Sequence, residues 1–345
     1  MSPVTIGAAQ MAGQDQLVRV IDTLADAFAD LAAGRTRSPS RTVLEHGPQR
    51  QLLAGAAVWE RHGVGSVKIT TLTPGNPERG LPLVHGLVVL TDLATGQVTA
   101  LLDGAALTAV RTGAVAGLAT RLCAARDAGD LAVIGAGVQA RAMVQAVSAV
   151  RPIRSVRVFS RDRDRTTTFA GWVRATFGHQ VTVCGTARAA VADAAVICTA
   201  TSTDGRTPLV AADWVRPGAH VNIIGGTHEG AIEVDPALLA TAFVVVEERA
   251  AALADAGEVR AALAGGLISE DDLHELGTLV TGQAAGGPGR TTVFRGVGIA
   301  IEDTATAAAL YAAVPHAATG TSLYAGPAPP TRSPAPATPV TAAGG

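Results

Sequence analysis

The stretch that most constrains the fold of this chain is Ala132–Ala140, which reads Ala-Val-Ile-Gly-Ala-Gly-Val-Gln-Ala. An apolar run ends at Ile134, and a long segment of small residues begins at Gln139. This order predicts a strand, a tight turn and the N-terminus of a helix, the unit that holds a dinucleotide pyrophosphate. The helix start supplies free N–H groups and the positive end of a dipole. Glycine pairs also occur in ordinary strand–helix turns, so the flanking sequence has to decide.

Each position of this turn has a separate expected role. Gly135 permits the tight bend, and Gly137 lets the backbone approach the phosphates, with Val138 and Gln139 opening the helix. Ala140 stands where a third glycine is usual and is still small enough for close packing of the helix on the strand. The turn therefore predicts a bound NAD(H) or NADP(H).

Composition narrows the class of protein. The 345 residues suffice for two domains, 48% of them are hydrophobic, and the net charge is −2 with no basic stretch, which argues against nucleic acid as a partner. The apolar runs are too short for a membrane span, and early acidic residues argue against a signal peptide. Three cysteines stand at no metal-ligand spacing. We expect a cytoplasmic protein without a metal.

The region before the turn predicts a helix followed by a largely antiparallel sheet. Apolar spacing indicates a helix over 16–31, and strands are expected at 42–44, 51–58, 65–72, 87–92 and 98–102. Lys68 lies inside one of these strands, so it is either an edge residue facing water or a site residue facing a cleft. Arg41, just before the first strand, is either a solvated charge or an anion ligand.

A second candidate lies in the helix predicted over 107–125. Arg111 sits there among small apolar residues, with Thr108 and Thr112 beside it and no acidic residue at helical spacing. A buried guanidinium without an acid in reach suits an incoming carboxylate, which it can bind through two N–H groups. The alternative is an arginine that snorkels to the surface.

The segment after the turn bears on the choice of cofactor. A strand predicted at 155–159 ends in Ser160-Arg161, where an acid would bind the ribose 2′-OH of NAD and where Ser and Arg accommodate the 2′-phosphate of NADP. NADP(H) is therefore preferred, and Asp162 keeps NAD(H) possible. The strand at 195–199 ends in Thr199-Ala200-Thr201, hydroxyl groups that either face the cofactor or cap a loop.

The rest of the chain continues as alternating strands and helices. Strands are expected at 220–224, 243–246 and 291–294, and helices at 247–264, 269–276 and 299–313. A glycine-rich loop, 225–230, follows the first of these strands at the edge where open α/β sheets bind ligands. The residues from 325 onward, rich in Pro, Ala, Thr and Gly, read as a disordered tail.

In these residues the chain resembles the ornithine cyclodeaminase/μ-crystallin family, from about residue 15 to residue 314. The resemblance rests on the order of several modest motifs, and Gln139 after the glycine pair is particularly similar to this family. The motifs are Gly65–Thr70, Pro74–Pro77 with Gly80–Pro82, Thr108–Ala114, Gly135–Ala140, Pro217–Asn222 and Gly298–Asp303.

The resemblance implies a homodimer and an α/β fold. In this fold a Rossmann dinucleotide-binding domain is inserted in an α+β substrate-binding and dimerisation domain. The implied boundaries are 1–120 for the first part of the substrate domain, 121–298 for the Rossmann domain, 299–324 for the returning closing helix and 325–345 for the tail.

The resemblance also assigns roles to single residues. Arg111 would clamp the carboxylate of an amino-acid or imino-acid substrate, Arg41 would be a further carboxylate contact, and Lys68 would hydrogen-bond the carboxylate or the reacting nitrogen. Thr112 would lie near the nicotinamide or the phosphates, and Val297 would pack on the nicotinamide side.

Two departures from the family pattern bear on the reaction. Cyclodeaminases of the family have an aspartate base where this chain has Thr227, and a hydroxyl cannot deprotonate an ammonium at neutral pH. His228 or Glu229 could substitute for it. Many relatives read Met-Pro-Ala where this chain reads Gly55-Ala56-Ala57, and an acid that some cyclodeaminases carry there is missing too.

These features favour an NAD(P)H-dependent reductase of a cyclic imine carboxylate, such as 1-pyrroline-2-carboxylate or 1-piperideine-2-carboxylate. Lys68 and Thr227 would then orient the imine or stabilise its protonated form. The alternatives are an ornithine or lysine cyclodeaminase with recycled NAD, an amino-acid or N-substituted amino-acid dehydrogenase, and a non-catalytic NADPH-binding protein. Retention of both Lys68 and Arg111 argues against the last of these.

Overall fold

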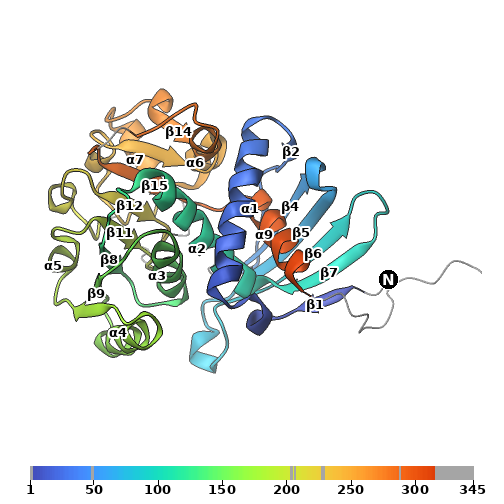
Figure 1. The fold of residues 1–345 in the computed structure, drawn as a ribbon, viewed down its shortest axis with the longest axis horizontal. Coiled ribbons are helices and arrows are strands. Elements are labelled where there is room, and N and C mark those ends of the chain that lie inside the picture. The colour runs from blue at the N-terminus through green and yellow to red at the C-terminus, as the bar shows by residue number, and fades with distance from the viewer. Residues whose placement is uncertain are drawn as a thin grey trace, which may run out of the picture.

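The computed structural model describes residues 3–47, 50–202, 205, 207–226, 230–286 and 289–314. Their strands form two sheets, one of seven strands and one of eight, which stand side by side with helices between them (Figure 1). The expected tail, 325–345, and the end of the closing segment, 315–324, lie outside the described residues. Among the described helices, none combines the length and the apolar character that a membrane crossing requires.

The seven-stranded sheet is built from the first part of the chain. Its order is β1-β7-β6-β5-β4-β2, with β3 paired to β4, and every pair is antiparallel except β1 with β7. The expected antiparallel sheet is confirmed, and the short strands β1 and β2 are additions to it. The strands are β1 (Val4–Ile6), β2 (Thr36–Arg37), β3 (Thr42–Glu45), β4 (Gln51–Trp59), β5 (Val64–Leu72), β6 (Val84–Asp92) and β7 (Val98–Asp103).

Three helices pack on one face of this sheet. They are α1 (Gln14–Ala32), α2 (Gly104–Cys123) and α9 (Ala300–Ala313), and α9 brings the end of the described chain back onto β4 and β5. The strands alternate accordingly, because Ser66 and Lys68 point toward these helices while Val67 and Ile69 point away. Val67 and Ile69 keep 42% and 45% of their surface exposed. The outer face of the sheet is therefore apolar and uncovered in the single chain.

The eight-stranded sheet is parallel throughout, in the order β10-β9-β8-β11-β12-β15-β13-β14. Its strand order reverses between β8 and β11, which is the switch point where such sheets bind dinucleotides. The predicted fold class, a Rossmann domain inserted in an α+β domain, is confirmed. The strands are β8 (Asp130–Ile134), β9 (Ser155–Phe159), β10 (Gln180–Val183), β11 (Val196–Thr199), β12 (His220–Ile223), β13 (Phe243–Val246), β14 (Leu273–Glu275) and β15 (Thr292–Arg295).

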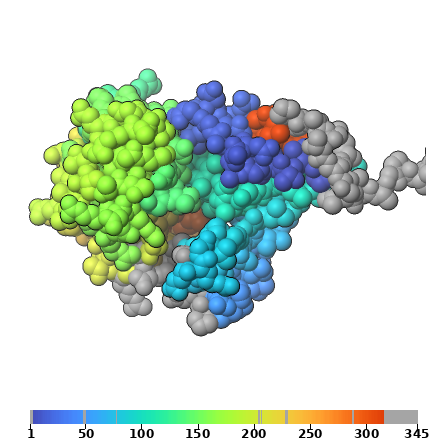
Figure 2. Space-filling view, turned by 90° about the horizontal axis from the view of Figure 1, so that it is seen from below, coloured from blue at the N-terminus to red at the C-terminus, as the bar shows by residue number. Residues whose placement is uncertain are grey.

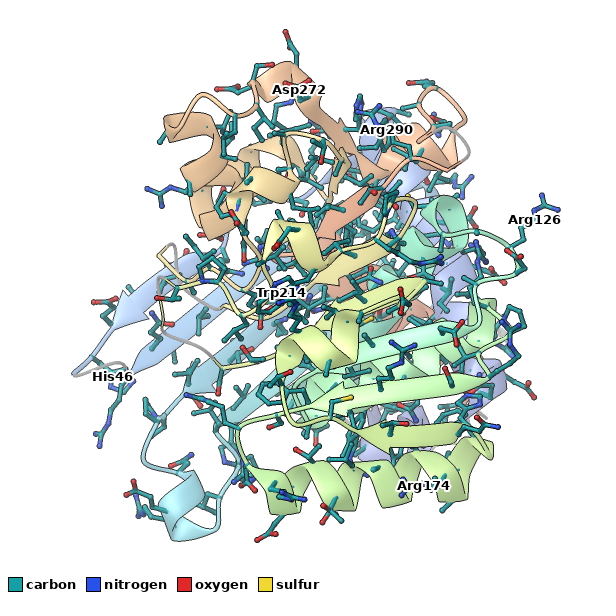
Figure 3. All side chains as sticks on the ribbon, turned by 90° about the vertical axis from the view of Figure 1, so that its left-hand side faces the viewer. His46, Arg126, Arg174, Trp214, Asp272 and Arg290 are labelled. Atoms are coloured by element: carbon teal, nitrogen blue, oxygen red, sulfur yellow. The ribbon has the colours of Figure 1, made fainter. Side chains whose placement is uncertain are left out.

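Helices connect successive strands of the second sheet. In Figure 3, Arg174 of α4 lies near one edge of this sheet and Asp272 near the opposite edge. The helices are α3 (Val138–Val150), α4 (Arg163–Phe177), α5 (Ala187–Val191), α6 (Arg249–Asp255), α7 (Gly257–Ala264) and α8 (Leu276–Val280).

Two helix predictions in this part of the chain were wrong. The helix expected over 247–264 is two helices, α6 and α7, which meet at Ala256. The helix expected over 269–276 is a short 3₁₀ turn, the strand β14 and the start of α8. The acidic residues that suggested a helical first turn instead close a local turn, in which Asp272 accepts hydrogen bonds from Ser269. Pairing with β13 then buries Leu273.

The helix α2 lies between the two sheets and fixes their relation. It is apolar on nearly all sides, as expected of a helix surrounded by protein. Gly113 packs so closely on α3 that an added Cβ would lie 2.8 Å from the Ala142 carbonyl oxygen. On the side of the second sheet, Asn222 of β12 donates a 2.9 Å hydrogen bond to the Thr120 hydroxyl. Residues on α2 therefore have little freedom to move relative to the second sheet.

A buried carboxylate also links several elements of the first lobe to one another. Asp30 on α1 has no exposed surface and accepts hydrogen bonds from Trp59 at 2.7 Å and from Arg35 at 2.6 and 2.8 Å. Arg61 adds an ion pair at 2.9 Å. The hydrogen bond of Trp59 and the charges of both arginines hold the pKa of Asp30 below its usual value, although burial acts in the opposite direction.

Candidate active site

A hollow separates the two lobes on the face seen in Figure 2. Green and yellow residues of the second lobe form one wall, and cyan and blue residues of the first lobe form the other. A small brown-red patch from the late part of the described chain is visible at its base. Segments that lie far apart in the sequence therefore meet at this cleft.

Lys68 belongs to the inner face of the first sheet and not to an exposed edge. Its Nζ donates a 2.8 Å hydrogen bond to Asp303 Oδ1 on α9 and lies 3.5 Å from the Thr108 hydroxyl on α2. Only 15% of its side chain is exposed. Burial lowers the pKa of Lys68, and the neighbouring Asp303 carboxylate opposes part of that change.

Arg111 converges on the same group of acids. Its Nη1 donates to Glu302 Oε2 at 3.0 Å, and its Nε lies 3.5 Å from Asp303 Oδ1. The expectation that no acid lies in reach of Arg111 was wrong, because α9 supplies two from a position about 190 residues later. The guanidinium also lies against Gly298, where an added Cβ would come within 2.6 Å of Nη1. Glycine at this position, with φ near +80°, leaves the space that Arg111 occupies.

Glu302, the acid that Arg111 contacts, lies in a strongly buried environment. Burial raises the pKa of Glu302 well above its usual value, and the nearby carboxylate of Glu247 raises it further. Glu247 itself accepts backbone N–H groups from Val297 at 2.9 Å and Gly298 at 2.7 Å. The guanidinium of Arg111 is permanently charged, and its buried Nε has no hydrogen-bond acceptor among the described residues. The guanidinium can therefore still bind an anion.

Arg41 bridges the two lobes instead of lying free in the cleft. Its Nη2 donates to Asp255 Oδ2 at 2.8 Å, and its Nη1 donates to the Val297 carbonyl oxygen at 3.3 Å. A third of its side chain is exposed. Arg41 is thus a partly exposed charge paired with Asp255, and its contact with a substrate carboxylate stays a prediction. Val297 lies beside it, half-buried, at the start of the segment that leads into α9.

The glycine turn has the shape that a dinucleotide requires. Gly135 has φ near +122°, and a Cβ there would lie 2.5 Å from the Ala200 carbonyl oxygen, so only glycine fits. A Cβ on Gly137 would meet nothing within 4 Å, which leaves open space at the start of α3. Val138 is 69% exposed beside it.

Two buried polar atoms near this turn lack partners among the described residues. They are the Thr112 hydroxyl on α2 and Gln139 Oε1 on α3. An unpaired buried polar group is costly unless a ligand or water satisfies it. Together with the open space at Gly137, these atoms fit a nicotinamide dinucleotide.

Thr199, the last residue of β11, and Thr201, just after it, both direct their hydroxyl groups to another side chain of the protein. Thr199 donates to Glu233 Oε2 at 2.7 Å, and Thr201 donates to Glu233 Oε1 at 2.6 Å. Ala200 between them bonds back to Ile134 through its N–H group. Of the two alternatives, the contacts match a loop anchor, and cofactor contact from this segment stays a prediction. Glu233 was not predicted as a partner of these threonines, because an acid after a glycine-rich loop has many possible environments.

At the tip of β9, the side chain of Asp162 is engaged locally. It accepts from the Arg165 backbone N–H at 3.0 Å, which caps α4, and pairs with the Arg165 guanidinium at 3.2 Å. Ser160 is half-buried and Arg161 is exposed beside it. The acid that kept NAD(H) possible is thus occupied by its own helix.

Thr227, His228 and Glu229, the three candidates for the position of the cyclodeaminase base, lie outside the described residues. The described chain reaches Gly226 on one side of them and resumes at Gly230 on the other. The structure therefore places the ends of this segment at the carboxyl edge of β12.

The model of the ornithine cyclodeaminase/mu-crystallin family matches residues 4–317. The chain belongs to this family. The resemblance expected from the ordered motifs is thereby confirmed over nearly the whole described chain.

Among curated relatives, the chain is 35% identical over 297 residues to a Delta(1)-pyrroline-2-carboxylate reductase of Bacillus cereus, covering 85% of this chain and 90% of the relative. It is 31% identical over 280 residues to the ketimine reductase mu-crystallin of Mus musculus, covering 81% and 85%.

Among solved structures, the Delta(1)-pyrroline-2-carboxylate reductase of Thermococcus litoralis in complex with NADH and L-proline matches with a TM-score of 0.84 and 30% identity. The match covers 90% of this chain and 96% of that one. An archaeal alanine dehydrogenase dimer with bound NAD matches with a TM-score of 0.82 and 28% identity, with the same coverage.

Proposed function

We propose that this protein is an NAD(P)H-dependent reductase of a cyclic imine carboxylate such as 1-pyrroline-2-carboxylate. The observation that carries the proposal is the convergence of Lys68 of β5 and Arg111 of α2 on one carboxylate oxygen of Asp303 on α9. The reductases of Bacillus cereus and Thermococcus litoralis support the same substrate class.

The positions of two cations and two acids explain how the site would take a carboxylate. Lys68 and Arg111 carry positive charges, and the carboxyl groups of Asp303 and Glu302 lie beside them. The substrate would enter with its carboxylate ionised and its imine nitrogen unprotonated. Arg111 Nε has no hydrogen-bond partner among the described residues, and we propose that this guanidinium binds the substrate carboxylate. Arg41, between the lobes, is the second carboxylate contact.

Lys68 supplies the proton in this reaction. When bound, NAD(P)H delivers a hydride to the carbon of the C=N bond, and the nitrogen needs a proton to become the secondary amine of the product. Burial lowers the pKa of Lys68, which makes the ammonium a better proton donor than an exposed lysine. Asp303 holds that ammonium in place at 2.8 Å. Thr227 is proposed to orient the imine from the loop after β12.

The bound cofactor is proposed to be NADP(H). Gly135, Gly137, Val138 and Gln139 would hold the pyrophosphate at the start of α3, Thr112 would face it from α2, and residues 199–201 and 297 would lie along the nicotinamide half. At the adenosine end, Ser160 and Arg161 would bind the 2′-phosphate. The engagement of Asp162 with the N-terminus of α4 supports this choice.

We expect the protein to oxidise NADPH with 1-pyrroline-2-carboxylate or 1-piperideine-2-carboxylate. The Arg111→Ala variant should lose about a hundredfold or more in kcat/KM, because a desolvated charge contact to the carboxylate is worth about 3 kcal/mol. Lys68→Ala should lose a comparable amount while binding NADPH normally. The measurement is loss of NADPH absorbance with purified protein.

A control without added NADPH uses ornithine or lysine. Release of ammonia there would establish a cyclodeaminase and contradict the proposed reduction. Oxidation of NADPH only with amino acids or keto acids plus amines would indicate a dehydrogenase, and cofactor binding without turnover of any substrate would indicate a non-catalytic binder.

The pH dependence of kcat/KM should reveal the proton donor. Because the pKa of Lys68 is lowered by burial, the active ammonium form is present at low pH and is lost as pH rises through a value below the ordinary 10.5. Lys68→Arg should move this limb to higher pH, since a guanidinium stays protonated. A limb that is identical in Lys68→Arg would belong to the imine substrate and would remove Lys68 from the role of acid.

The choice of cofactor is tested at Arg161. Arg161→Ala should weaken NADPH binding by about tenfold, the value of one charged hydrogen bond to phosphate, and leave NADH binding nearly unchanged. Titration of both cofactors by fluorescence gives the two dissociation constants. Arg163, which lies two residues later and is also exposed, provides the matched control, because Arg163→Ala removes the same charge nearby. Equal losses for both cofactors in Arg161→Ala would show that the strand tip does not select.

We further propose a homodimer formed through the outer face of the first sheet. Four large apolar side chains from the strands β3, β5 and β6 are exposed there, at 42% to 55%: Leu44, Val67, Ile69 and Leu87. An uncovered apolar face of this kind is typical of an interface. The archaeal alanine dehydrogenase, a dimer, supports the proposal.

Ile69→Glu should halve the mass in solution, because a carboxylate buried in an apolar interface is costly. Light scattering after size-exclusion chromatography measures the mass. Val183→Glu is the matched control, since Val183 is 36% exposed on the edge strand β10 of the other sheet. A dimer that survives Ile69→Glu would place the interface elsewhere.

A further inference from the structure

Glu233 is a buried charged residue that the proposed reaction does not use. It follows the loop after β12 and has no exposed surface. Its carboxylate accepts four hydrogen bonds, two on each oxygen. Burial raises the pKa of Glu233, and the hydrogen bonds from Thr201 and Thr199 act against that change.

The four donors come from two different strand ends. From the end of β11, Thr199 and Thr201 donate their hydroxyl groups, and Thr201 adds its backbone N–H at 2.8 Å. From the end of β12, Gly225 donates its backbone N–H at 2.7 Å. One carboxylate therefore sets the spacing between the two strand ends that flank the dinucleotide side of the cleft.

The residues just after β12 are held from two sides. The N–H of Gly225 donates to Glu233, which lies eight residues later in the chain. Arg295 of β15 adds a second contact by donating to the Gly226 carbonyl oxygen at 3.2 Å. Glu258 completes the arrangement, because it pairs with Arg295 at 2.9 Å and accepts the backbone N–H of Glu233 at 2.7 Å.

We propose that Glu233 is a positioning residue for hydride transfer, fixing the segment 199–201 beside the cofactor relative to Gly225 and Gly226 at the end of β12. The inference rests on the proposed function. It names no new contact with substrate, because Glu233 acts only through the two strand ends. A displacement of one of these ends by a fraction of an ångström changes the distance over which the hydride moves.

The hydrogen-bond pattern explains why an ionised acid is required. Each carboxylate oxygen accepts one backbone N–H, from Thr201 on Oε1 and from Gly225 on Oε2. Hydroxyl groups can rotate to accept a hydrogen bond, but backbone N–H groups cannot. In Glu233→Gln the side-chain NH₂ would therefore face one of these two donors in either orientation. The substitution keeps the volume of the side chain and breaks the link between the strand ends.

The test is single-turnover reduction of the imine, with protein and NADPH in excess and stopped-flow absorbance as the readout. We expect Glu233→Gln to slow hydride transfer by about tenfold to a hundredfold, while the dissociation constant of NADPH changes less than about threefold. NADPH deuterated at the transferred position identifies the hydride step. Thr199→Val, which removes a single hydroxyl donor, should give a smaller slowing and covers the case in which Glu233→Gln does not fold.

The matched control is Asp30→Asn, which disturbs a buried, multiply bonded carboxylate whose partners are not site residues. It should lower the melting temperature and leave the hydride-transfer rate unchanged. If Glu233→Gln transfers hydride at the unmodified rate, or slows only as much as Asp30→Asn, the positioning role is wrong. Failure of the unmodified protein to reduce any imine would instead overturn the proposed function.

Discussion

The site depends on the burial of two cations by acids that arrive from the far end of the chain. Lys68 on β5 and Arg111 on α2 are both largely removed from water, which is costly without compensation. The compensation comes from Asp303 and Glu302 in the first turn of α9, where acidic residues also suit the helix dipole. If α9 did not return to the first sheet, both cations would be buried and unpaired. The inserted topology is therefore a condition for the chemistry of the cleft.

The two lobes meet at this charge cluster because each contributes to it. The first lobe supplies Lys68, while Glu247 reaches the segment before α9 from the end of β13 in the second sheet. Arg41 spans the gap a second time through Asp255. Two carboxylates of the second lobe, Glu247 and Asp255, thus bind residues next to the charge cluster of the first lobe. The bottom of the cleft is therefore held in place by both lobes. In the proposed reaction, a substrate carboxylate would meet N–H groups that are already oriented, so little ordering would be needed on binding.

Local patterns in the sequence predicted those features that depend on residues close together in the chain. The apolar run with Gly135 and Gly137 predicted the turn, because few residues other than glycine tolerate its backbone angles and its close approach to Ala200. Alternation predicted the strands of the first sheet. The pairing of Arg111 with Glu302 could not be predicted in this way, since no spacing rule links residues 191 positions apart. The strand β14 was missed because three residues next to a good helix cap carry almost no periodic signal.

For Thr199 and Thr201, the sequence predicted where the residues lie but not what their hydroxyl groups contact. Their position at the carboxyl end of β11, beside the glycine turn, follows from the sequence, and the structure places Ala200 against Gly135. What the sequence lacks is the direction of the side chains, which is set by Glu233 from beyond the next strand. Polar residues at a strand end can serve a ligand directly or hold the backbone that serves it. Here both hydroxyl groups donate to the buried carboxylate of Glu233, so the structure shows the second of these roles, in which the hydroxyl hydrogens hold the backbone at the end of β11.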